Sequence, residues 1–184
     1  FERKDCICLN GEYDYAVTGD TADAPKKYDG KILVPFSVES ELSGVGKALL
    51  PDQRLWYRRK FTVGKEFSGK EALLHFGAVD WQCSVWVNGK LVGEHTGGYN
   101  PFTFNITDVI TEGENELVVK VFDPTDAGHQ QRGKQILVTK GFWYTATSGI
   151  WQTVWLEPVN RCRIASLRLV PAIDEGVIRI HIKR

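Results

Sequence analysis

The chain has 184 residues, 42% of them hydrophobic, which is enough to bury one sizeable core. Basic and acidic residues number 23 each, so no excess charge indicates a nucleic acid or an anionic membrane surface as a partner. No apolar run approaches the roughly 18 residues that a membrane span requires.

Apolar and polar residues alternate in segment after segment, and turn residues separate the segments. This pattern predicts an antiparallel all-β protein with few or no helices. The expected strands are residues 13–17, 55–63, 71–76, 83–87, 90–92, 102–106, 116–122 and 150–157. Asn88-Gly89 is typical of a two-residue hairpin turn, because both positions accept a positive φ. Eight or so strands around one core favour a jelly-roll β-sandwich.

Two of these strands carry a clear burial pattern. In residues 55–63, Leu55, Tyr57, Phe61 and Val63 share one face, which predicts a half-buried strand. In residues 150–157 both faces are apolar, which predicts a strand in the middle of a sheet.

The pattern of strands and turns changes after Glu157-Pro158. Residues 163–170 and 177–183 predict two further strands, and two strands cannot close a core. We therefore expect one domain over residues 1–158, and over 159–184 the first strands of a second domain whose remainder lies outside this sequence. This hairpin is expected to dock on the main domain or on a neighbouring copy. The start at Phe1 rather than Met predicts that an upstream segment has been removed.

The four cysteines, Cys6, Cys8, Cys83 and Cys162, lack the density of a disulfide scaffold and the spacing of a zinc site. Cys6 and Cys8 are expected to be small buried thiols on one face of a strand. No ligand set for calcium or sodium is visible either. The sequence predicts no metal and no cofactor.

Three stretches together resemble the N-terminal sugar-binding domain of the family 2 glycoside hydrolases, the group of the β-galactosidases, β-glucuronidases and β-mannosidases. They are LWYRRKF at 55–61, FGAVDWQCSVWVNGK at 76–90 with GGYNPF at 97–102, and SGIWQTVWLE at 148–157. The resemblance covers roughly residues 8–158. The tail is also similar to the entry into that family's immunoglobulin-like second domain.

The resemblance implies a galactose-binding-like jelly roll beside a catalytic TIM barrel, which supplies the two catalytic glutamates of a retaining β-galactosidase-like hydrolase. A barrel needs about 250 residues, and this chain has no room for one. We therefore assign no catalytic residue and expect the chain alone to be inactive. The expected partners are a carbohydrate substrate and the protein's own immunoglobulin-like and barrel domains. Oligomeric state is left open, and the family's habit of processing complex glycans implies a periplasmic or secreted location.

Asp80, Trp81 and Gln82 are predicted to form a short loop with an acid, an indole and an amide side by side. Sugars are held by aromatic faces and by planar polar groups, so these residues are candidate substrate contacts. In the family, the side chain at the Asp80 position can reach into the barrel's active site, and some members carry Asn there. The alternative is an Asp80 that caps its own turn above a packed Trp81.

Residues 123–147 form a long polar stretch, which is uncommon in a compact sandwich unless it has a function. By position it resembles the family loop that lines the substrate pocket. Its candidate contacts are Asp126, His129, Arg132, Trp143 and Tyr144. Trp143 stands where the family often has an acid, and Ala146 replaces a basic residue of many relatives, so the substrate class is not specified. The alternative is an interdomain loop with Trp143 and Tyr144 as interface anchors.

Three function classes follow from these patterns. The first is the non-catalytic front domain of a β-glycosidase. The second is a free-standing carbohydrate-binding module that uses Trp81, Trp143 and Tyr144 as a platform. The third is a structural adhesion sandwich, which predicts no affinity for sugar and local hydrogen bonds at Asp80.

Overall fold

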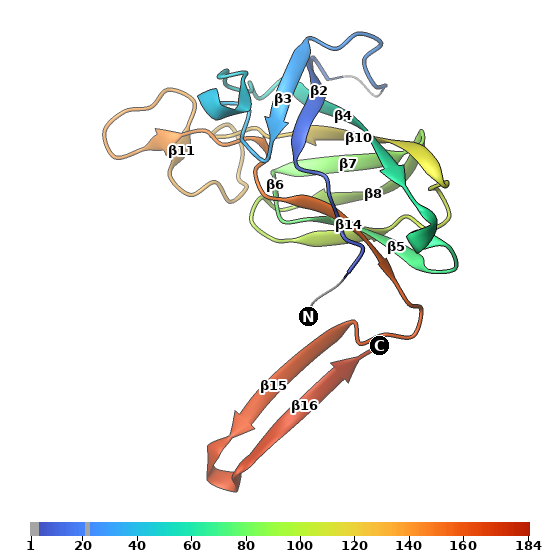
Figure 1. Cartoon of the computed structure of the whole chain (residues 1–184). Coiled ribbons are helices and arrows are strands. Elements are labelled where there is room, and N and C mark those ends of the chain that lie inside the picture. Colours follow the sequence, from blue (N-terminus) through green and yellow to red (C-terminus); the bar gives the residue numbers. More distant parts are fainter. Residues whose placement is uncertain (1–3, 21–22) are drawn as a thin grey trace.

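The computed structural model describes residues 4–20 and 23–184, and its main body is a sandwich of two antiparallel sheets (Figure 1). The six-stranded sheet has the order β3 (Gly30–Val34), β2 (Gly11–Thr18), β4 (Arg54–Val63), β10 (Gly113–Phe122), β7 (Gln82–Val87) and β8 (Lys90–Thr96). The four-stranded sheet has the order β1 (Ile7–Cys8), β14 (Val154–Val159), β5 (Glu71–Phe76) and β9 (Phe102–Asn105). The predicted antiparallel β-sandwich is confirmed. The described residues hold no α-helix, only the short 3-10 turns η1 (Glu41–Ser43), η2 (Lys65–Phe67) and η3 (Ile173–Glu175).

The core lies between the two sheets and follows from the period of two along each strand. In β4, Leu55, Tyr57 and Phe61 are buried as predicted, whereas Lys60 and Thr62 are exposed. The residues that meet from both sheets include Leu55, Tyr57, Val85, Leu117, Val119, Leu74, Phe76 and Leu156. The predicted hairpin is confirmed as β7 and β8, with Asn88 and Gly89 at φ 50° and 74°.

The predicted strand over residues 150–157 is divided in two. β13 (Gly149–Ile150) pairs with β6 (Val79–Asp80), whereas β14 pairs with β1 and β5. The chain changes partners between them, so residues 151–153 leave the ladder. The central position holds for β14, which lies between β1 and β5.

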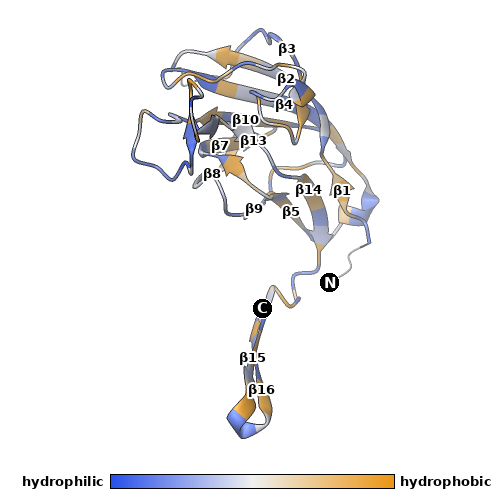
Figure 2. Cartoon of the chain, turned by 90° about the vertical axis from the view of Figure 1, so that its left-hand side faces the viewer, coloured by the Kyte–Doolittle hydropathy of each residue, from blue (hydrophilic) through white to orange (hydrophobic). Residues whose placement is uncertain are grey.

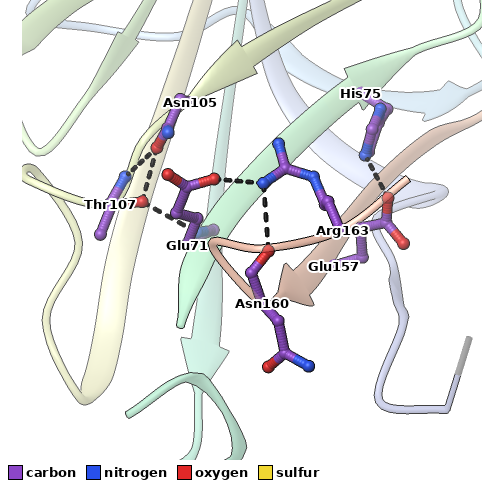
Figure 3. A network of polar contacts seen from close by, with 8 residues as sticks. Glu71, His75, Asn105, Thr107, Glu157, Asn160 and Arg163 are labelled. Carbon is purple, nitrogen blue, oxygen red and sulfur yellow. Dashed lines mark hydrogen bonds and ion pairs between the residues drawn. The ribbon is translucent and has the colours of Figure 1, made fainter. Parts of the chain in front are cut away.

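The hairpin of β15 (Ser166–Ala172) and β16 (Val177–Lys183) extends away from the sandwich (Figure 1). The expectation that it docks on the main domain is wrong, because every residue of β16 and most of β15 are exposed. The linker that precedes the hairpin contacts the sandwich through Arg163. Arg163 pairs with Glu71 of β5 and donates to the Asn160 carbonyl, beside the His75–Glu157 contact on the same sheet (Figure 3).

The cysteine prediction is wrong for two of the four thiols. Cys6 and Cys8 are exposed, because β1 is the edge strand of its sheet and both side chains lie on its outer side. Cys83 is buried, and none of the four cysteines forms a disulfide with another described residue. No helix among the described residues has the length and hydropathy needed to cross a bilayer.

Candidate functional site

Asp80 lies where the chain passes from β5 of the four-stranded sheet to β7 of the six-stranded sheet. It ends β6, and the ladder with β13 sets it opposite Gly149. The predicted short loop over Asp80, Trp81 and Gln82 is wrong, because Asp80 belongs to β6 and Gln82 begins β7. The bond between Asp80 and Trp81 is a cis peptide bond.

Asp80 is only 3% exposed as a whole residue, and the hydrogen-bond partner of its carboxyl comes from the long loop. Gln135 Nε2 donates to Asp80 Oδ2 at 3.3 Å and lies 3.3 Å from the Tyr99 hydroxyl. Gln135 is held in turn, because its Oε1 accepts from the Thr147 amide at 2.6 Å. Asp80 therefore does not cap its own turn but is held from a distant part of the sequence.

Residues 97–101 form one wall beside Asp80. The Trp151 indole donates to the Gly98 carbonyl at 2.8 Å, and the Trp151 ring meets Tyr99 edge-on at 6.2 Å. A Cβ on Gly98 would overlap the Asp80 carboxylate, so only glycine allows this close approach. The sequence predicted a turn here and did not connect it with Asp80.

Burial dominates the electrostatics of this region. Burial, with a smaller contribution from nearby Asp123, raises the pKa of Asp80 to about 7, and the Gln135 hydrogen bond opposes the shift. Burial also raises the pKa values of Asp123 and Glu39 above their ordinary range. Ser148 joins these two, since its Oγ donates to Asp123 at 2.7 Å and its amide to Glu39 at 2.8 Å. Asp80 therefore exchanges its proton near neutral pH.

The long loop forms a second group of candidate residues. The Arg132 guanidinium donates to the Asp126 carbonyl at 2.7 Å and lies 6.0 Å from the Trp143 ring centre. Trp143 stacks on Phe142, and His129 is exposed. A hollow of about 560 Å³ lies here, lined by Asp126, Ile136, Leu137, Val138, Lys140 and Trp143.

A short parallel pair connects the loop group with Asp80. β11 (Gln135–Ile136) runs beside β12 (Tyr144–Thr145), so Gln135 faces Asp80 while its pairing partner Tyr144 is exposed. The Trp81 ring and Gln82 make their contacts with the six-stranded sheet. The Trp81 ring meets the edge of Phe122, and Gln82 is paired with Phe122 and Thr96 inside the six-stranded sheet.

Five residues of the Asp80 site were not singled out from the sequence: Gln135, Tyr99, Trp151, Asp123 and Glu39. Tyr99 and Trp151 lie inside the recognised stretches, which was the available signal for them, whereas no sequence pattern marks Gln135. Within the described parts of the chain, no three His, Cys, Asp or Glu side chains lie close enough to hold a metal ion.

Residues 8–158 match the family described as "Glycosyl hydrolases family 2, sugar binding domain". The chain belongs to this family. This family 2 domain is 35% identical over 130 residues to a β-galactosidase of Thermoanaerobacter pseudethanolicus. The match covers 69% of the chain and 17% of that protein. The chain is 30% identical over 158 residues to a β-galactosidase of Bacteroides ovatus, covering 85% of the chain and 15% of that protein.

Solved structures agree with this family 2 domain assignment. A β-D-mannosidase from Dictyoglomus thermophilum has a TM-score of 0.70 at 27% identity, over 91% of this chain and 24% of that one. A Faecalibacterium prausnitzii β-glucuronidase has a TM-score of 0.75 at 22% identity, over 99% of this chain and 36% of that one, which is a likeness of fold. The predicted family and jelly-roll fold are confirmed. The chain spans less than a fifth of the two β-galactosidases.

Proposed function

We propose that this sugar-binding domain is the front part of a retaining, β-galactosidase-like enzyme, and that a separate barrel domain of the same protein cleaves the glycosidic bond. The family match over residues 8–158 supports this proposal, and it favours a domain of a hydrolase over a free-standing module. Relatives named as β-galactosidases support the substrate class.

In this proposal the Asp80 site borders the substrate pocket. The carrying observation is a nearly buried carboxyl held by Gln135 beside Tyr99 and Trp151, three groups suited to a sugar. A carboxyl with a pKa near neutral pH can donate a hydrogen bond to a sugar hydroxyl when protonated and accept one from it when ionised. The second group, Asp126, Arg132 and Trp143, would form the outer part of the same pocket.

An activity assay tests both parts of the proposal. The chain alone should not hydrolyse nitrophenyl β-galactoside, whereas the full-length protein should. Asp80→Ala in the full-length protein should lower kcat/KM by roughly 10- to 100-fold, because a substrate hydroxyl loses a hydrogen bond to an ionisable group. The control is Asp108→Ala on an exposed loop, with no expected change. Turnover by the chain alone, or full activity of the Asp80 variant, would contradict the proposal.

We also propose that residues 159–184 begin a second, immunoglobulin-like domain. One face of the hairpin is wholly apolar, and Figure 2 shows hydrophobic stretches on both strands. Leu169 and Ile180 lie opposite each other and are 56% and 59% exposed. On the other face, Arg168 lies opposite His181. An isolated hairpin with one apolar face is marginally stable and needs further strands to cover it.

Without such strands, copies of the chain should associate through this face. Ile180→Lys is expected to abolish concentration-dependent self-association, measured by sedimentation velocity. His181→Lys, the neighbouring change on the polar face, serves as the matched control and should leave association intact. A wild-type chain that sediments as a monomer at every concentration would contradict this prediction.

A further inference from the structure

The outer face of the six-stranded sheet carries a second apolar cluster, separate from the core. Alternation along β4 sends Leu55 and Tyr57 inward and Trp56 outward, where Trp56 packs with Ala16 and Val118. Trp86 of β7 stacks on Trp56 at 5.9 Å between ring centres and 28° between ring planes. Trp56 is 1% exposed and Trp86 is half-buried, so the Trp86 ring is the one that solvent reaches.

Two hollows lie on this face, on either side of the β10 residue Lys120. One, of about 260 Å³, is lined by Trp56, Trp86, Val118, Glu116 and Asp23. The other, of about 200 Å³, is lined by Arg54, Gln82, Ser84, Glu94 and Lys120. Lys120 Nζ is also 5.5 Å from the Trp56 ring centre and 5.8 Å from that of Trp86. Lys120 therefore joins the aromatic hollow to the polar one.

The pairing register makes the two hollows neighbours. Phe122 of β10 pairs with Gln82 of β7, and the Arg54 guanidinium of β4 lies 4.0 Å from the centre of the Phe122 ring. The next rows on the same face are Trp56, Lys120 and Ser84, then Arg58, Val118 and Trp86. Same-face rows are about 7 Å apart along a strand, so the face forms one continuous surface.

The chemistry of this surface suits a neutral sugar. An indole ring packs against the C–H face of a sugar ring, and carboxylate, amide and ammonium groups bond its hydroxyls. Among the described residues, the Glu116 carboxylate has no hydrogen-bond or ion-pair partner, so its oxygens are available. Both charge signs are present, Glu116 and Glu94 against Arg54 and Lys120, which argues against a strongly charged ligand.

We propose that this face binds a neutral glycan chain, with one sugar ring against Trp86 and the next beside Gln82 and Lys120. Each hollow is smaller than the roughly 300 to 1,000 Å³ of pockets that hold drug-sized ligands, so each takes a single ring. This site is distinct from the Asp80 site, since Gln82 and Trp86 lie on the outer face and Asp80 lies at the joint with β13. The proposal stands independently of the substrate pocket, and assigns the domain a second contact with long or branched carbohydrate.

The test is a titration of the chain with lactose, followed through the tryptophan indole signals in two-dimensional NMR. Saturable shifts are expected at Trp86. Trp86→Ala should lower the affinity for lactose about tenfold, because the sugar ring loses the indole on which it stacks. Glu116→Gln, a surface change that preserves folding, should also weaken binding, whereas Asp80→Asn should leave these shifts unchanged.

Other results would overturn the proposal. These are an absence of saturable shifts at Trp86, unchanged affinity in both Trp86→Ala and Glu116→Gln, or loss of the Trp86 shifts in Asp80→Asn. The Asp80 comparison separates the two sites, because failure of the substrate-pocket proposal would appear as unaltered kcat/KM in the full-length Asp80 variant. Protection of this face by a second copy, detected as concentration-dependent shifts without lactose, would also overturn it.

Discussion

Gly149→Ala is expected to destabilise the domain by about 3 to 4 kcal/mol, more than the backbone effect alone. Gly149 has φ +91°, and an added Cβ would overlap the Tyr57 hydroxyl and lie 3.0 Å from Leu55. The Tyr57 hydroxyl is buried and accepts the Ile150 amide at 3.2 Å, so its displacement would leave that amide unpaired. Overpacking and the left-handed backbone add to the cost. Urea unfolding measures the loss.

Gly113→Ala is the matched control for this variant. Gly113 has a similar φ of +96°, but its Cβ would meet nothing within 4 Å. The control should therefore lose only about 1 kcal/mol, the cost of the backbone conformation. Equal losses in the two variants would remove the role assigned to the Tyr57 hydroxyl. Because Gly149 lies opposite Asp80, only Gly149→Ala should also shift NMR signals at the Asp80 site.

Asp80→Asn is expected to stabilise the domain at pH 8 by about 2 to 4 kcal/mol, since one pKa unit corresponds to about 1.4 kcal/mol. Burial raises the pKa of Asp80 from its usual 3.8 to about 7. Between these values the folded state keeps a proton that the unfolded state releases, so stability falls as pH rises from about 4 to 7. Above pH 7 the cost is complete and constant. Asparagine carries no charge there and still accepts from Gln135.

The measurement is the free energy of unfolding of both proteins from pH 4 to pH 8. The two curves should converge at the acid end and diverge towards neutral pH. Some slope should remain in the variant, because burial also raises the pKa values of Asp123 and Glu39. Asp108→Asn, a change at an exposed position, should reproduce the wild-type curve. A constant difference between Asp80→Asn and wild type at every pH would rule out this linkage.

The strands and the family could be predicted because their signals are local. Alternation placed Leu55, Tyr57 and Phe61 in the core, and Asn88-Gly89 placed the hairpin turn. The candidate site was predicted only in part. Asp80 was identified by its place in a recognised stretch, but its partner Gln135 is 55 residues away in a loop with no periodic pattern.

The sequence showed how side chains alternate along each strand. It did not show which strand lies next to which, or in what register. A two-residue period says that Trp56 and Tyr57 point in opposite directions. It does not say that Trp56 would find Trp86 across β10, because that depends on sheet order and register. The same reason accounts for the division of residues 150–157 into two strands with different partners.

Composition and local pattern were therefore sufficient for an all-β sandwich, its main strands and the existence of a tail hairpin, because each depends on neighbours in sequence. The three recognised stretches were sufficient for the family. The pairing of Asp80 with Gln135, the aromatic face of the six-stranded sheet and the exposure of Cys6 and Cys8 required the three-dimensional arrangement. These features arise when strands distant in sequence are brought together. Burial and pKa then depend on which groups surround a side chain, and one-dimensional patterns do not contain that information.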